Sequence, residues 1–199
     1  DELHKPRHRG AFSWAHVEAL RPDGALARAR KWPMDFDDSP AQALHAHPNA
    51  LCVSPAGLEL IKLYHRFCEQ PRRAQSGFAE IGFGHVLRPI DDDLLWISVQ
   101  HADTLLREDL RCVEIYLNAT VRVVLEQREF DALASLVFDV GMLNFEHSTL
   151  RVMLNAGDKP GAADALRHWG AHRVLADDLP GRARRNAEAT MFLRGELVT

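Results

Sequence analysis

Several sequence features are scarce in this chain of 199 residues, and each scarcity excludes a class of protein. The three cysteines (Cys52, Cys68 and Cys112) form no C-x-x-C pair, which argues against a disulfide framework and a cysteine-rich zinc site. No run of about 18 apolar residues occurs, so the sequence predicts no membrane-spanning helix. The formal net charge is only -4, and no overall basic field indicates a nucleic-acid partner.

The first 50 residues differ in composition from the rest of the chain. The chain begins at Asp1 and shows no apolar stretch typical of a signal peptide, so we expect a fragment of something longer. We expect residues 1–50 to be an N-terminal extension or linker and residues 51–199 to be the main domain. His45 and His47 resemble a metal-binding pair, but no third ligand is evident, so we expect solvated loop histidines.

From Ser54 onward the pattern becomes regular and predicts a mainly helical domain. Ser54-Pro55 is a favourable helix start, with a capping hydroxyl followed by proline. Apolar residues at helical spacing extend this helix through Cys68 to about Glu69. A later segment, residues 129–140, is apolar on nearly every side, which is typical of a buried central helix. Further helices are expected over residues 99–117, 148–155, 158–169 and 181–193.

A glycine-rich stretch after the first helix predicts the only sheet. Residues 76–85 read S-G-F-A-E-I-G-F-G-H, and glycine within a strand usually marks a bulge, a bend or a close backbone approach. We expect a small hairpin or three-stranded sheet here, with Glu80 as its single carboxylate at the lip of a cleft. The fold class is therefore α+β, mainly helical.

Four sequence blocks follow one another along the chain: G-x-x-x-I-G-F-G-H (77–85), F-D-A-L-A-S-L-V-F-D-V-G (130–141), L-N-A-G-D-x-x-G-A-A (154–163) and R-A-R-R-x-A-E (182–188). The order of these blocks resembles the phage-type lysozymes and endolysins of glycoside hydrolase family 24. The resemblance covers about Ser54 to Glu196 and implies a two-lobed fold, with a small β-sheet lobe joined to a larger helical lobe by the helix from Val99. It also implies peptidoglycan in the intervening cleft, cleaved between N-acetylmuramic acid and N-acetylglucosamine.

The catalytic pattern of that family, Glu-x8-Asp (or Cys)-x5-Thr, falls without a gap on His65, Ala74 and Glu80. In such enzymes an acid protonates the leaving oxygen while a second group positions or activates water on the far face. The spacing is kept here, but all three residue types have changed. The resemblance therefore implies a lysozyme-like domain that is catalytically degenerate and binds glycan or has a structural role.

Two alternatives keep the chain active. In the first, the chemistry is redistributed: Glu80 acts as nucleophile or base and His65 as a protonated general acid, so that activity falls as pH rises past about 6.5. In the second, the register shifts and Glu69 becomes the acid, because it would follow His65 by one helical turn.

The resemblance also implies a set of substrate-binding residues, and we expect the Arg182/Arg185 region to face Glu80. Nucleic-acid binding by the arginines at 182, 184 and 185 is a further alternative, although such arginines are more often solvated and the net charge is negative. The substrate-binding residues are Gly82, Phe83, His85, Phe138, Asp139, Ser148 and Arg182.

The partner implied by the resemblance is the glycan strand of bacterial peptidoglycan, and no metal or organic cofactor is implied. We expect the domain to work in the periplasm or cell wall of a target bacterium. Delivery would be supplied by other parts of a longer phage or secreted effector protein. Cys68 and Cys112 are predicted to lie on apolar helix faces, so we expect them to pack in the core.

Overall fold

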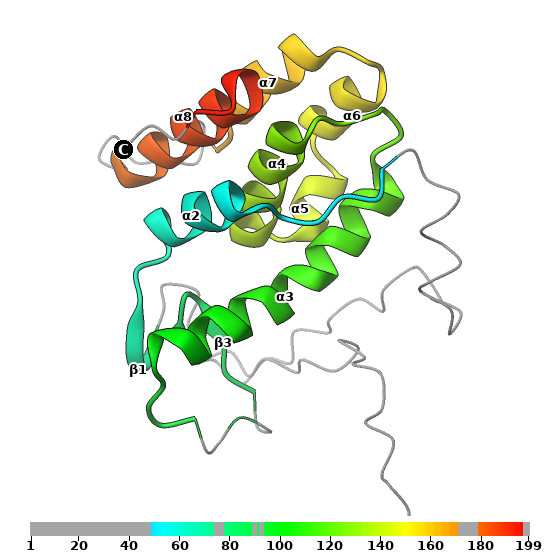
Figure 1. Cartoon of the computed structure of the whole chain (residues 1–199). Helices are drawn as coiled ribbons and strands as arrows, with labels where there is room; N and C mark the ends of the chain where they lie inside the picture. The colour runs from blue at the N-terminus through cyan, green and yellow to red at the C-terminus, as the bar shows by residue number, and fades with distance from the viewer. Residues whose placement is uncertain (1–48, 74–77, 89–90, 92–93, 171–178, 197–199) are drawn as a thin grey trace, which may run out of the picture. The chain divides into compact units, whose positions relative to one another are not determined.

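The computed structural model describes residues 49–73, 78–88, 91, 94–170 and 179–196. They form a helical domain with one small sheet (Figure 1). In chain order the elements are α2 (Pro55–Tyr64), β1 (Cys68–Arg73), β2 (Ala79–Gly82), β3 (His85–Val86), α3 (Val99–Thr120), α4 (Gln127–Val140), α5 (Met142–Glu146), α6 (Thr149–Asn155), α7 (Lys159–Arg167) and α8 (Leu179–Arg194).

Helix α2 begins where the sequence predicts but ends earlier. The Ser54 hydroxyl accepts a hydrogen bond from the Gly57 amide, and proline occupies the first turn. The helix stops at Tyr64, because His65 adopts a non-helical backbone as its C-cap. The prediction that it continues to Glu69 is wrong: Cys68 and Glu69 lie in β1, where they belong to the sheet instead of continuing the helix.

The sheet is antiparallel with strand order β1-β2-β3, which confirms the predicted three-stranded sheet. Glu80 lies opposite Arg72 of β1 on one side and Val86 of β3 on the other. The amide of Ile97, in the segment before α3, donates to the carbonyl of Glu69 at 2.9 Å. The edge strand β1 therefore pairs with β2 on one side and accepts this bond from the segment before α3 on the other.

Two apolar clusters make the two lobes, and α3 contributes to both. The N-terminal half of α3 packs against the sheet and α2 through Leu106 and Leu110, whereas Val113 and Leu117 pack in the helical cluster. The centre of that cluster is α4, nine of whose residues are buried. This arrangement confirms the predicted α+β, mainly helical, two-lobed fold.

The segment before α2 is attached to α3 by side chains. The Asn118 amide group donates to the Leu51 carbonyl at 2.8 Å and accepts from the Leu51 amide at 3.2 Å. One turn earlier on α3, a Glu114 carboxylate oxygen accepts from the Val53 amide at 2.8 Å. These bonds satisfy backbone groups that no strand or helix uses, and they fix one wall of a small pocket beside α3.

The remaining differences from the sequence-based expectations concern helix ends and one short helix. The short helix α5 was not predicted, and α3 extends to Thr120 instead of 117. In the described part of the chain, no helix has the length and hydropathy needed to cross a membrane. Nor do three or more potential metal ligands gather among these residues. The histidines at 45 and 47 lie outside the described residues.

Candidate active site

His65 stands directly after α2, where it faces α4 and α8. Its Nε2 atom lies 2.9 Å from Nη1 of Arg184. A guanidinium can only donate, so Nε2 accepts and the ring carries its proton on Nδ1. The edge of the ring packs against Phe138, with 5.0 Å between the ring centroids. On the other side a Cβ at Gly84 would lie 2.8 Å from Nδ1, so glycine is needed at that position.

This environment disfavours the protonated form of His65. Burial is the largest cause and the Arg184 charge the next, and together they lower the pKa of His65 to about 4, although Asp139 opposes them. Both causes act in the direction expected for a cation that loses water and approaches another cation. At neutral pH the ring is therefore an uncharged hydrogen-bond acceptor for Arg184.

Arg184 itself is the centre of a buried polar cluster. It is 6% exposed, and its guanidinium donates to Asp139 Oδ1 at 2.9 Å, Glu188 Oε1 at 3.0 Å and the Ser135 carbonyl at 2.9 Å. Arg185 pairs with the same two carboxylates, Asp139 and Glu188. Two guanidiniums thus face two carboxylates, and this balance of charge is kept only while the side chain at position 65 is neutral.

This cluster corrects the expectation for the arginines of the last helix. In the described residues, the hydrogen bonds of Arg184 and Arg185 join α8 to Ser135 and Asp139 of α4. Both arginines also bond to Glu188 of α8 itself, whereas Arg182 is exposed at the helix start. The arginine pair does not face Glu80 through any of these bonds. The spacing Arg184, Arg185 and Glu188 (i, i+3 and i+4) was a usable sequence signal, because such residues share one helix face.

Glu80 lies in the middle of β2, partly buried, opposite Arg72. Burial raises the pKa of Glu80, and the Arg72 charge opposes this effect. The Arg72 charge also contributes to the lowered pKa of His65, so one cation influences both residues. Glu69 is exposed on β1. The register-shift alternative required Glu69 to lie one helical turn after His65, but α2 ends at Tyr64, so the two residues do not share a helix face.

Three of the expected substrate-binding residues pack inside the sheet lobe. Gly82 has φ +64°, and a Cβ there would lie 3.0 Å from Ala102. Phe83 is 8% exposed. His85 is 4% exposed, and its Nδ1 lies 2.9 Å from Asp109. Burial alone would lower the pKa of His85, but the hydrogen bond and charge of Asp109, together with Asp91, outweigh it and raise the pKa.

The other four expected substrate-binding residues lie in three different surroundings. Phe138 and Asp139 lie with His65 in the polar cluster at the end of α4. Ser148 caps α6: its hydroxyl accepts from the Arg151 amide at 3.1 Å and donates to the Phe145 carbonyl at 2.6 Å. Arg182 is exposed. The structure therefore gathers His65, Phe138 and Asp139 into one site, next to residues that the sequence did not single out, Ser135 and Glu188.

Comparisons with known proteins identify the family. The sequence model described as phage lysozyme matches residues 63–188, a span that includes His65 and Glu80. The chain belongs to the phage lysozyme family. An endolysin of Acyrthosiphon pisum secondary endosymbiont phage 1 is 36% identical over 143 residues, which are 70% of this chain and 97% of that relative.

Two solved structures extend the similarity of this phage lysozyme family member to the fold. The muramidase domain of SpmX from Asticaccaulis excentricus has a TM-score of 0.63 and 31% identity over 71% of this chain and 97% of that domain. A mutant of P22 lysozyme has a TM-score of 0.60 and 29% identity over 72% of this chain and 99% of its own. The lysozyme fold predicted from the sequence blocks is thereby confirmed.

Proposed function

We propose that the chain is a lysozyme-fold domain that binds the glycan strands of bacterial peptidoglycan without cleaving them. The observation that carries this proposal is the state of His65. Hydrolysis of a glycosidic bond needs a group that protonates the leaving oxygen, and His65 is half-buried, uncharged and engaged with Arg184 through Nε2. Ala74, at the position of the second catalytic group, cannot activate water.

The charge balance of the cluster also favours a binding role. Asp139, Glu188, Arg184 and Arg185 neutralise one another, so no unpaired charge is left to act as an acid or a base. Such paired groups, once buried, stabilise one arrangement of the helices that they join. The cluster therefore serves as the structural support of a surface on which the glycan lies.

A second candidate function keeps catalysis and assigns it to Glu80 and His65. The observation that favours it is the raised pKa of Glu80, since perturbed carboxyl groups gather at catalytic sites. A raised pKa suits a proton donor better than a nucleophile, and the low pKa of His65 opposes its use as an acid. We therefore place this candidate second.

Cosedimentation with purified sacculi tests both candidates in one experiment. The binding proposal expects the chain in the pellet and no release of reducing ends into the supernatant between pH 5 and pH 8. Glu80→Gln should sediment equally well. Release of reducing ends by the wild type, abolished in Glu80→Gln, would establish the second candidate, and failure to sediment with sacculi would contradict the first.

The setting proposed for this binding is the periplasm or cell wall, where peptidoglycan lies. Residues 51–199 would form the glycan-binding domain and residues 1–50 an extension that links it to other parts of a longer protein. Truncation to residues 49–199 keeps the buried Asn49, which bonds to Val123 and Leu125. It should therefore leave cosedimentation unchanged, and loss of cosedimentation would assign a binding role to the extension.

A further inference from the structure

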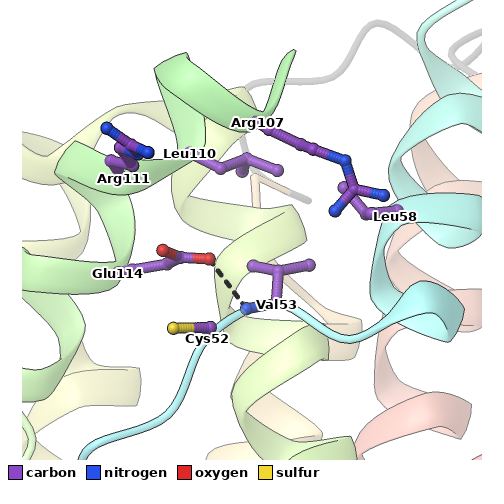
Figure 2. Close-up of a pocket in the computed structure, with 7 residues that line it drawn as sticks. All are labelled: Cys52, Val53, Leu58, Arg107, Leu110, Arg111 and Glu114. Atoms are coloured by element: carbon purple, nitrogen blue, oxygen red, sulfur yellow. Dashed lines mark hydrogen bonds between the residues drawn. The ribbon is translucent and has the colours of Figure 1, made fainter. Parts of the chain in front are cut away.

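A small pocket lies between α3, the start of α2 and the segment that precedes α2 (Figure 2). Its volume is about 180 Å³, below the range of about 300–1,000 Å³ that drug-sized ligands occupy. The apolar part of its lining consists of Val53, Leu58 and Leu110. The lining includes none of the candidate active-site residues, so the pocket is a separate feature of the domain.

Two arginines of α3 give this pocket its positive charge. Arg107 and Arg111 follow one another by one helical turn, and both are exposed. In Figure 2 the Arg107 side chain extends toward Leu58, and Arg111 lies on the other side of Leu110. Within the described part of the chain neither guanidinium has a hydrogen-bond or ion-pair partner. Like charges at this spacing destabilise a helix by about 0.2–0.5 kcal/mol, and an anion bound by both would remove that repulsion.

The acidic residue of the pocket does not neutralise these arginines by direct pairing. The Glu114 carboxylate is turned to the backbone, where Oε1 accepts from the Val53 amide at 2.8 Å, as the dashed line in Figure 2 marks. Burial raises the pKa of the Cys52 thiol, and so does Glu114, so the thiol adds no negative charge. Two cations and one carboxylate leave the pocket with a net positive charge beside an apolar floor.

We propose that this pocket binds the terminal carboxylate of a short alanyl peptide, with the carboxylate at Arg107 and Arg111 and a methyl group against Leu58 and Leu110. A guanidinium fork matches a carboxylate through two parallel N–H···O bonds. The small volume favours alanine over larger side chains. Stem peptides of peptidoglycan carry such an end. This source rests on the proposed function, whereas the carboxylate site itself does not.

Titration of the full chain with N-acetyl-D-alanyl-D-alanine, followed by calorimetry or NMR, tests the site directly. Saturable binding is expected, and Arg107→Gln and Arg111→Gln should each weaken it at least tenfold, which corresponds to about 1.4 kcal/mol. Arg167→Gln is the matched control, because Arg167 is an exposed arginine of α7 outside the pocket. It should leave the affinity unchanged. The C-terminal amide of the same peptide should bind at least tenfold more weakly.

Three results would overturn the proposal. The first is that the peptide shows no saturable binding. The second is that the wild type, Arg107→Gln and Arg111→Gln bind the peptide with equal affinity. The third is that inorganic phosphate binds as tightly as the peptide. The last would show an anion site without preference for an alanyl group. Circular dichroism of each variant establishes that the substitutions, which lie at exposed positions, leave the fold intact.

A comparison of two cell-wall preparations identifies the source of the peptide. Intact sacculi carry stem peptides, and sacculi treated with an amidase do not. If stem peptides are the source, Arg107→Gln and Arg111→Gln reduce retention on intact sacculi only. Equal retention of wild type and variants on both preparations rejects this source. A chain that binds the dipeptide but neither preparation contradicts the proposed glycan-binding function and still supports the carboxylate site.

Discussion

Acidification should destabilise this domain through His65, and the size of the effect follows from its surroundings. The pKa of His65 is lowered from 6.5 to about 4 by burial and by Arg184. The unfolded chain therefore binds a proton at a higher pH than the folded chain does. The stabilising contribution is fully present above pH 6.5 and is lost as pH falls through 4. One pKa unit corresponds to about 1.4 kcal/mol, so the full loss is about 3 kcal/mol, of which roughly 2 kcal/mol falls between pH 7 and pH 5.

Urea unfolding of wild type and His65→Gln at pH 7, 6 and 5 measures this contribution. Glutamine keeps an acceptor for Arg184 but does not titrate in this range. The wild type should lose roughly 2 kcal/mol more than His65→Gln between pH 7 and pH 5. His85, whose raised pKa acts in the opposite direction, is present in both proteins, so its effect cancels in the difference.

An exposed histidine provides the control for this experiment. His101 lies on the surface of α3, and His101→Gln should follow the wild-type pH dependence. Parallel pH dependence of wild type and His65→Gln would contradict the lowered pKa, because His65 would then titrate alike in the folded and unfolded chains. Agreement between fluorescence and circular dichroism transitions is needed for a two-state free energy.

Two further predictions concern the contacts that hold His65 and its cluster. Gly84→Ala should lower the free energy of unfolding by about 1–3 kcal/mol more than Gly157→Ala. Both glycines have positive φ, but of the two only Gly84 would place a new Cβ within 4 Å of a side chain, that of His65. Equal losses of unfolding free energy in chemical denaturation would contradict this packing. Glu188→Gln should cost about 3–5 kcal/mol, because it leaves buried guanidinium charge uncompensated. Glu59→Gln, on the exposed face of α2, should cost less than about 0.5 kcal/mol, and a thermal shift of similar size in the two variants would argue against a buried cluster.

The sequence predicted most of the helices because their starts depend on local residues. Ser98 and Ser148 cap α3 and α6, close to the helix starts predicted at residues 99 and 148, since a hydroxyl at this position bonds to an amide only a few residues away. The end of α2 depends on distant residues instead. The spacing of Cys68 continues the helical period, but β2 and the Ile97 amide pair with the backbone around it. That competition is not visible in a local pattern.

In the candidate site, too, features set by local residues were predicted and features set by distant residues were not. The spacing of the family motif identified position 65 and the change from acid to histidine. The protonation state of His65 could not be predicted, because it depends on burial and on Arg184, which is 119 residues away in the chain. Ser135 was missed for a related reason: it is a single polar residue on an otherwise apolar helix, and its partner Glu188 lies 53 residues away in the chain.

This chain keeps the lysozyme fold, and we propose that it does not cleave peptidoglycan. An assay of peptidoglycan clearing tests this proposal directly. A turbidity or zymogram assay should compare wild type, Glu80→Gln and the triple variant His65→Glu/Ala74→Asp/Glu80→Thr, which restores the family pattern. We expect no clearing by the first two proteins and clearing by the triple variant. Clearing by the wild type that Glu80→Gln abolishes would contradict the loss of catalysis.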